Sequence, residues 1–197
     1  MEGPDDRKVS RFHLTVIAMQ PVAGRVKTRL VPPLSHEQAV EIAAACLHDT
    51  FEAVSSCLDR NADVRAVALI EGPTGSWIPP GFEVRYQVGA GLRERLANAF
   101  DLLGPGLIVG MGTPSAGPHF DAAFDAIRVG SDALGLIHDG GYWGIGLANA
   151  ERAVFDDVGI RTGQNGADQL QQIRALGRSV ELLPAVHDLD PLMTSRR

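Results

Sequence analysis

The chain has 197 residues, of which 45% are hydrophobic and 21% are charged, and these values fit one folded domain with a substantial core. Its formal net charge of −6 argues against a general nucleic-acid-binding protein, because such proteins present a broad positive surface to phosphate backbones. The polar start contains no apolar signal-peptide core, and no run approaches the roughly 18 apolar residues of a membrane-spanning helix. We therefore expect a cytoplasmic protein without a membrane span.

The ends of the chain differ in composition from its middle. We expect a flexible tail over residues 1–10, a single α/β domain over 11–191 and a short C-terminal tail over 192–197. Cys46 and Cys57 are the two cysteines, and both fall on one predicted helix. At 1.5 Å per residue they lie ~16 Å apart, which is too far for a disulfide bond, so we interpret both as core thiols.

Runs of β-branched and apolar residues alternate with stretches of helical periodicity along the chain. The predicted strands are 13–18, 63–70, 82–87, 107–111, 133–137, 145–148 and 179–183. The predicted helices are 36–57, 92–103, 119–128, 150–156 and 167–176, the first opened by a capping-box pattern at Ser35 and Gln38. This alternation predicts a Rossmann-like αβα sandwich with a mostly parallel sheet and helices on both faces.

A basic turn follows the first predicted strand. Gly24 allows the backbone to approach a ligand closely, and three cations follow within five residues: Arg25, Lys27 and Arg29. Backbone N–H groups and cations at the end of a strand can bind phosphate or another anion. The alternative interpretation is a solvated basic turn. The segment matches neither the Walker A pattern nor GxGxxG.

Four glycine-rich or polar segments each follow a predicted strand, at 21–29, 87–92, 110–115 and 138–143. In open parallel sheets, ligands bind beyond the carboxyl ends of the strands. The sequence therefore predicts that these segments gather at one edge of the sheet and form a binding site there.

Taken in order, segments 21–30, 87–96, 110–114, 139–143 and 188–190 resemble a bacterial family of GT-A-like glycosyltransferases, mostly uncharacterised and in part assigned as arsenosugar-type. The resemblance covers nearly the whole chain. It implies a single GT-A-like domain with the nucleotide-diphosphate-sugar fold, related to that of sugar-nucleotide nucleotidyltransferases. It also implies that the basic turn approaches the nucleotide phosphates.

The chain departs from the family pattern at three positions. Gly112 stands where the family usually has an aspartate that serves as the Mg²⁺ or Mn²⁺ ligand, and glycine offers no side-chain oxygen. Met19 replaces a lysine, and His138 replaces a glutamate. Asp188 and Asp190 alternate and could supply a weak, partial metal shell, with capping or turn roles as the alternative. A divalent cation, Mg²⁺ or Mn²⁺, would therefore bind weakly if at all.

The remaining candidate site residues come from the same segments. Gln87, Gly91 and Thr113 are expected to contact the nucleotide, with strand-to-helix turn chemistry as the alternative for the first two. Asp139 is interpreted as a general base or a ligand for a sugar hydroxyl, and the alternative is an Asx turn at the glycine pair. The following residues are expected in a sugar or acceptor pocket, with core packing as the alternative for the aromatic pair: His138, Gly140, Gly141, Tyr142 and Trp143.

Two arginines of the second predicted helix, Arg93 and Arg95, are expected on its exposed side, and Leu92 is expected on its buried face. The two arginines directly follow the predicted glycine turn.

Three functions fit these residues. The first is a glycosyltransferase that binds a nucleoside diphosphate sugar and transfers the sugar to an unknown small-molecule acceptor, weakened or metal-independent because of Gly112. The second is a sugar-phosphate nucleotidyltransferase, and the third is a catalytically silent member that binds a nucleotide or a partner protein. The sequence does not indicate the oligomeric state.

Overall fold

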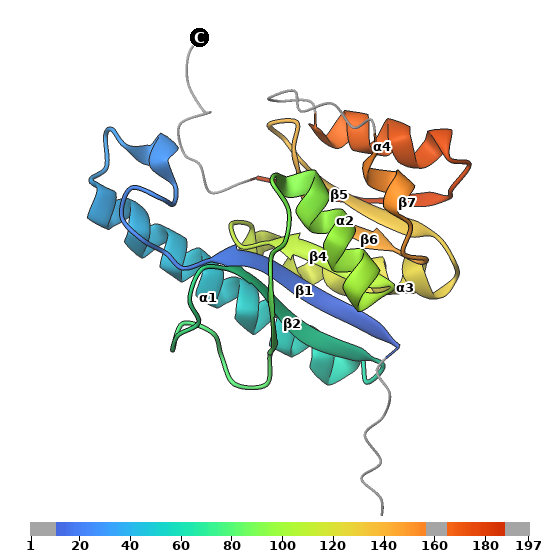
Figure 1. Cartoon of the computed structure of the whole chain (residues 1–197), viewed down its shortest axis with the longest axis horizontal. Coiled ribbons are helices and arrows are strands. Elements are labelled where there is room, and N and C mark those ends of the chain that lie inside the picture. The colour runs from blue at the N-terminus through green and yellow to red at the C-terminus, as the bar shows by residue number, and fades with distance from the viewer. Residues whose placement is uncertain (1–10, 157–164, 188–197) are drawn as a thin grey trace, which may run out of the picture.

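The computed structural model describes residues 11–156 and 165–187, which form a single α/β domain (Figure 1). Its centre is a seven-stranded sheet in the order β3-β2-β1-β4-β6-β5-β7. The strands are β1 Phe12–Met19, β2 Val64–Glu71, β3 Glu83–Tyr86, β4 Gly106–Gly110, β5 Asp132–Ile137, β6 Tyr142–Leu147 and β7 Val180–Val186. Every neighbouring pair is parallel except those of β6, which runs antiparallel to both β4 and β5. The predicted mostly parallel sheet is confirmed.

Helices cover both faces of this sheet (Figure 1). The α-helices are α1 His36–Arg60, α2 Leu92–Leu103, α3 Phe120–Arg128 and α4 Asn165–Ala175, and short 3-10 helices occur at η1 Thr28–Leu30, η2 Pro114–His119 and η3 Arg152–Phe155. Because side chains alternate along a strand, Val16 and Ala18 pack with α1 and α3, whereas Ile17 packs with the α2 side. One sheet therefore supports two apolar cores.

The start of α1 is fixed by the predicted capping box. The Ser35 hydroxyl accepts from the Gln38 backbone N–H at 3.2 Å, and the Gln38 side chain accepts from the Ser35 N–H at 2.9 Å. Such a cap stabilises a helix by about 1 kcal/mol. The helix that it starts buries Ala43 and Cys46.

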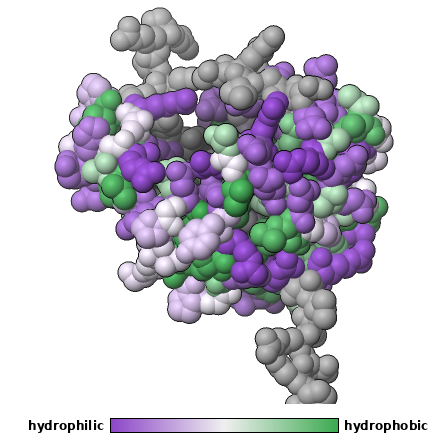
Figure 2. Space-filling view, in the orientation of Figure 1, coloured by the Kyte–Doolittle hydropathy of each residue, from purple (hydrophilic) through white to green (hydrophobic). Residues whose placement is uncertain are grey.

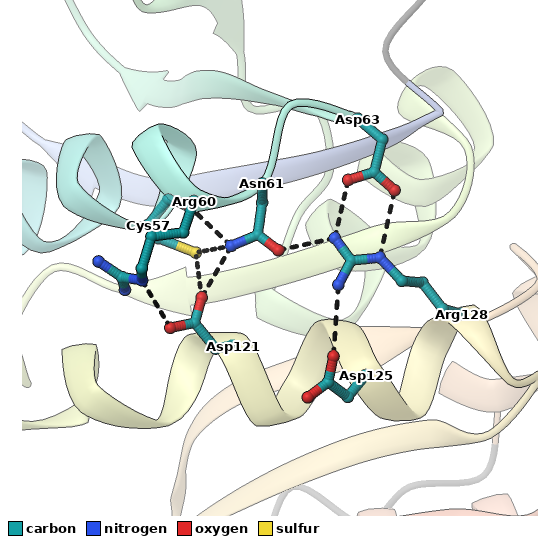
Figure 3. A network of polar contacts seen from close by, with 7 residues as sticks. All are labelled: Cys57, Arg60, Asn61, Asp63, Asp121, Asp125 and Arg128. Carbon is teal, nitrogen blue, oxygen red and sulfur yellow. Dashed lines mark hydrogen bonds and ion pairs between the residues drawn. The ribbon is translucent and has the colours of Figure 1, made fainter.

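At the amino edge of the sheet, a polar network joins the end of α1 to α3 (Figure 3). Asp121 accepts from Arg60 at 2.8 Å and from Asn61 at 2.7 Å, and Arg128 continues the chain of contacts to Asp63. Burial raises the pKa of the Cys57 thiol to about 12, so this thiol stays protonated. The network holds the two helices together at the end of the sheet opposite the predicted site.

Some boundaries differ from the prediction. β6 begins at Tyr142, not at 145, so Tyr142 and Trp143 belong to a strand and not to the preceding loop. Both cysteines lie buried on α1 and neither forms a disulfide, as predicted. The predicted tails, 1–10 and 192–197, lie outside the described residues. None of the helices in the described part of the chain is long and apolar enough to cross a membrane.

Candidate functional site

The carboxyl ends of the central strands lie side by side, as the sequence predicts. Met19 of β1 is level with Glu71 of β2, and Gly110 of β4 is paired with Ile17 near the end of β1. Tyr142, the first residue of the antiparallel β6, also lies at this edge because its strand runs the other way. The segments that follow these strands therefore surround one region, the candidate site.

The basic loop, residues 20–30, is anchored by two apolar side chains. Val26 is 7% exposed and Leu30 is fully buried, so the loop is fixed to the domain at both positions. Between them, Lys27 adopts the left-handed conformation with φ 45°, the one non-glycine residue with positive φ in the described ranges. That conformation costs a non-glycine residue about 1–2 kcal/mol. The residue that carries this backbone strain is therefore one of the three cations of the basic loop.

The turn itself presents the other charged groups. Gly24 has φ 77°, a conformation that favours glycine, and the Arg25 N–H donates to the Val22 carbonyl at 3.0 Å. Arg25 and Arg29 are exposed. The loop therefore offers cations and a glycine turn at the edge of the sheet, and its binding of phosphate stays a prediction.

A charged network joins this loop to the next one. The Arg25 guanidinium lies 3.5 Å from Glu71, and Arg95 lies 2.6 Å from the other oxygen of the same carboxylate. The hydrogen bond from Arg95 holds the pKa of Glu71 below its usual range, so the carboxylate stays ionised. Glu71 thus links the basic loop to the start of α2.

Arg95 corrects one sequence expectation. Its side chain turns inward and donates to the carbonyl of Gly89 at 3.1 Å, whereas Leu92, expected on the buried face, is 55% exposed. Long side chains on a helix lean toward the preceding turn of the helix. Because Arg95 lies one helical turn after Gly91, this spacing could have predicted that its side chain reaches back to the glycine turn.

Gln87 lies between the ends of β1 and β2. Its amide nitrogen donates to the Ala18 carbonyl at 2.8 Å and to the Leu69 carbonyl at 3.1 Å, and its oxygen accepts from Arg95 at 2.9 Å. The side chain therefore stabilises the sheet edge, and its predicted contact with a nucleotide remains a prediction. Gly91 is the N-cap of α2.

A pocket of about 220 Å³ lies between the basic loop, α1 and the end of β4. Arg25 and Lys27 contribute its charged lining, and Met19, Met111 and Gly112 lie at its sheet side. The Met19 N–H donates a weak hydrogen bond to the Met111 sulfur at 3.4 Å. Two of the three departures from the family pattern, Met19 and Gly112, therefore line the same cavity.

Thr113, which follows this pocket, is 5% exposed and precedes η2, where its carbonyl accepts from the Ala116 N–H at 3.0 Å. A buried threonine in this place supports the turn after β4. Contact with a nucleotide stays a prediction for this residue.

The turn between β5 and β6 shows the geometry of the Asx alternative. Asp139 is exposed, and its Oδ1 accepts from the Gly141 N–H at 3.1 Å. Gly140 has φ 95°, and its carbonyl accepts from the Gly166 N–H at 2.9 Å. This turn presents the Asp139 carboxylate to solvent, while its proposed role as a base remains a prediction.

The two aromatic residues after this turn differ in exposure. Trp143 is 1% exposed, its indole N–H donates to the Pro184 carbonyl at 3.2 Å, and Gly135 leaves room for its ring. Its position is that of a core residue, the alternative stated for the aromatic pair. Tyr142, at the start of the strand, is half-buried, and burial raises its pKa to about 12.

His138 lies on the exposed side of the same turn. Its ring stacks on that of His187, with centroids 4.2 Å apart, so the ends of β5 and β7 meet here. Asp188 and Asp190, the predicted weak metal pair, fall outside the described residues.

A group of acidic and histidine side chains lies elsewhere, on the exposed side of α1. His48, Asp49 and Glu52 place one ligand atom each within 4.8 Å of one another. Exposed acidic groups of this kind are common in proteins that bind no metal ion at them. At the candidate pocket, Gly112 has no side chain and so offers no oxygen ligand to a metal ion.

Comparison with solved structures identifies the class of fold. A provisionally named nucleotide-diphospho-sugar transferase from Desulfovibrio desulfuricans G20 matches with a TM-score of 0.78 at 22% identity, over 92% of this chain and 83% of that one. This likeness shows a nucleotide-diphospho-sugar transferase type of fold. A manganese complex of a Mycobacterium tuberculosis H37Rv protein has a TM-score of 0.47, at 16% identity over 91% of this chain and 92% of that one.

The structure of 2-C-methyl-D-erythritol 4-phosphate cytidylyltransferase from Thermus thermophilus has a TM-score of 0.43, at 18% identity over 86% of this chain and 87% of that one. None of the curated proteins compared with the chain matches it.

The chain belongs to the family described as "uncharacterized protein conserved in bacteria (DUF2064)", whose model matches residues 41–162, more than half of its length. The match runs from within α1 to just beyond η3, so it includes the ends of β2, β3, β4 and β5. The basic loop precedes the first matched residue.

Proposed function

We propose that this protein binds a nucleoside diphosphate sugar at the carboxyl edge of the sheet and transfers the sugar to a small-molecule acceptor. The observation that carries the proposal is the anchored basic loop, which holds a strained Lys27 and the exposed Arg25 beside the pocket. Cations fixed before the reaction balance the charge that develops on a leaving diphosphate without further reorganisation.

The acceptor side of the proposal uses the turn between β5 and β6. Asp139 is exposed there and its Oδ1 is oriented by the Gly141 N–H. In this arrangement the carboxylate takes the proton from an acceptor hydroxyl as the new glycosidic bond forms. His138 and Tyr142 would border the sugar, and Trp143 would support them from the core.

The basic loop has the main charge-balancing role in this proposal. Asp188 and Asp190 would hold Mg²⁺ or Mn²⁺ only weakly, because position 112 adds no oxygen ligand. When bound, the cation would supply additional charge for the diphosphate. Arg25, Lys27 and Arg29 would act in the same way without it.

Calorimetric titration with UDP-, GDP- and dTDP-sugars, each with and without Mn²⁺, tests the proposal. We expect one of these nucleotides to bind, with a dissociation constant that changes little when Mn²⁺ is added. If none of them binds under either condition, the proposal is wrong.

The silent-member alternative draws on Gly112, which lines the pocket without a side chain. It predicts nucleotide binding with no consumption of the nucleotide sugar, and it predicts that Gly112→Asp raises the affinity for Mn²⁺. Tight binding of Mn²⁺ to the parent in the presence of nucleotide would contradict this alternative. A nucleotidyltransferase would instead release pyrophosphate from a nucleoside triphosphate and a sugar phosphate.

A further inference from the structure

The pocket beside the basic loop has an unusual combination of walls. Its buried part is formed by Ala43 and Cys46 of α1, which are 2% and 3% exposed, and its sheet side by Met19 and Met111. Arg25 is the exposed, charged part of the lining. The cavity is therefore apolar and rich in sulfur inside, with positive charge close to it.

The inner walls suit a small apolar group. Thioethers and a thiol are polarisable, and methionine adapts its shape to fill irregular space around a ligand. The weak hydrogen bond between the Met19 N–H and the Met111 sulfur keeps the two methionine positions together. A strongly hydrated group would lose its water on entering this part of the pocket and would find few hydrogen-bonding side chains in return.

The volume limits the size of that group. An apolar cavity of about 150 Å³ holds one benzene molecule, so a pocket of about 220 Å³ accommodates a single ring or a short branched chain. It is smaller than the roughly 300–1,000 Å³ of sites that enclose a whole drug-sized ligand. Only one part of a larger ligand therefore fits inside.

The adjacent charges indicate what this group is attached to. Arg25 has 59% of its side chain exposed and pairs with Glu71 at 3.5 Å, an exposed pair of the kind that is worth little in water. Arg25 can therefore exchange this partner for a phosphate at small cost, and Lys27 lies on the same pocket. A phosphate held here would place its ester substituent beside the apolar walls.

We propose that the pocket binds the small apolar substituent of an organic phosphate whose phosphate group is held by Arg25 and Lys27. Within the proposed function, on which this inference rests for the role of the two cations, the sugar of the nucleoside diphosphate sugar has few hydroxyl groups and is not a fully hydroxylated hexose. No divalent cation is required for this binding.

On the face drawn in Figure 2, hydrophobic residues are scattered among hydrophilic ones. Of the exposed large hydrophobic residues in the described ranges, Leu92 and Leu102 share α2, whereas Val129 follows α3 and Leu182 lies on β7. The apolar contact in this proposal is confined to the pocket.

The test is calorimetry in EDTA with phenyl phosphate, inorganic phosphate and glucose 1-phosphate. We expect phenyl phosphate to bind at least about tenfold more tightly than the other two, because only its substituent gains by leaving water. Ala43→Leu, which fills the pocket, should remove this advantage and leave the binding of inorganic phosphate unchanged. Ala44→Leu, at the exposed neighbouring position of α1, is the matched control and should keep it.

If Ala43→Leu does not fold, a second variant still tests the inference. Met111→Gln keeps the length of a half-buried side chain and an acceptor for the Met19 N–H, but it makes the wall polar. It should also abolish the preference for phenyl phosphate. Equal affinities of the parent for all three probes would overturn this inference while leaving the proposed function intact if a UDP-, GDP- or dTDP-sugar binds. Failure of phenyl phosphate and of all three nucleotide sugars (UDP-, GDP- and dTDP-) to bind would overturn both.

Discussion

His13 provides a quantitative prediction about stability and pH. It is fully buried in β1, its Nε2 donates to the Gly104 carbonyl at 3.1 Å, and its Nδ1 accepts from the Thr15 hydroxyl at 2.8 Å. Burial lowers its pKa from 6.5 to about 3, so the folded protein keeps this ring neutral. The unfolded chain, in contrast, binds a proton near pH 6.5.

The sign of the effect follows from this difference. Above pH 6.5 neither state protonates the ring, so the shift costs no stability there. As the pH falls below 6.5, only the unfolded state gains a proton on this ring. The free energy of unfolding therefore falls by about 1.4 kcal/mol per pH unit until the pKa of the folded state is reached. Between pH 7 and pH 5 the loss from His13 alone is about 2 kcal/mol.

Urea denaturation of the parent and of His13→Gln at pH 7 and pH 5 measures this contribution. The variant is less stable at pH 7 because it disturbs a packed site, but its loss between pH 7 and pH 5 should be smaller by about 2 kcal/mol. Taking the difference removes the carboxylates and other histidines that both proteins share. If both proteins lose the same stability between the two pH values, the buried, neutral state of His13 is refuted.

Three further predictions concern stability. Arg178→Met should cost about 3–5 kcal/mol in urea denaturation, because Asp132 is 1% exposed and accepts from Arg178 at 2.7 and 2.8 Å; a cost below about 1 kcal/mol would contradict a buried ion pair. Lys27→Gly should be more stable than Lys27→Ala by up to about 1 kcal/mol, because only glycine escapes the left-handed strain, and the reverse order would contradict that conformation. Gly135→Ala should cost at least about 1–3 kcal/mol and change tryptophan fluorescence, because its new methyl group would overlap the Trp143 ring; an unchanged spectrum and stability would contradict that packing.

Local patterns in the sequence predicted most of the fold. The helix over 92–103 was predicted with its observed bounds, because Leu96, Phe100 and Leu103 repeat at helical spacing and glycines stand at both ends. The capping box at Ser35 was also predictable from the sequence, because both of its hydrogen bonds join residues that are three positions apart. Such features depend on neighbours along the chain.

Features that depend on contacts between residues far apart in the chain were harder to predict from the sequence. Nothing in the sequence indicates that β6 inserts between β4 and β5, because that choice is made by packing across the sheet. Trp143 follows a glycine turn and was expected beside a ligand, but Gly135 on the neighbouring strand opens space for it in the core. The pocket likewise combines Met19, Cys46 and Met111, which are far apart in the chain.

The candidate site was predictable in outline for a topological reason. Parallel strands place their carboxyl ends together, so the loops after Met19, Glu71 and Gly110 had to meet whatever their sequences. The interactions within the site were not predictable in the same way. Glu71 connects Arg25 to Arg95 by ion pairs between segments that are distant in the chain, and neither Glu71 nor Arg95 was a candidate.

The binding of UDP, GDP and dTDP in EDTA, each titrated separately, tests the central claim most directly, namely that the basic loop binds a diphosphate without a metal ligand at position 112. The parent and Arg174→Gln, which removes an exposed cation of α4, should bind one of these nucleotides with the same dissociation constant. Arg25→Gln combined with Lys27→Gln should weaken binding by at least about tenfold, since each charge-assisted hydrogen bond is worth about 1.5–3 kcal/mol. Equal affinity in the double variant, or binding that appears only when Mn²⁺ is added, would contradict the claim.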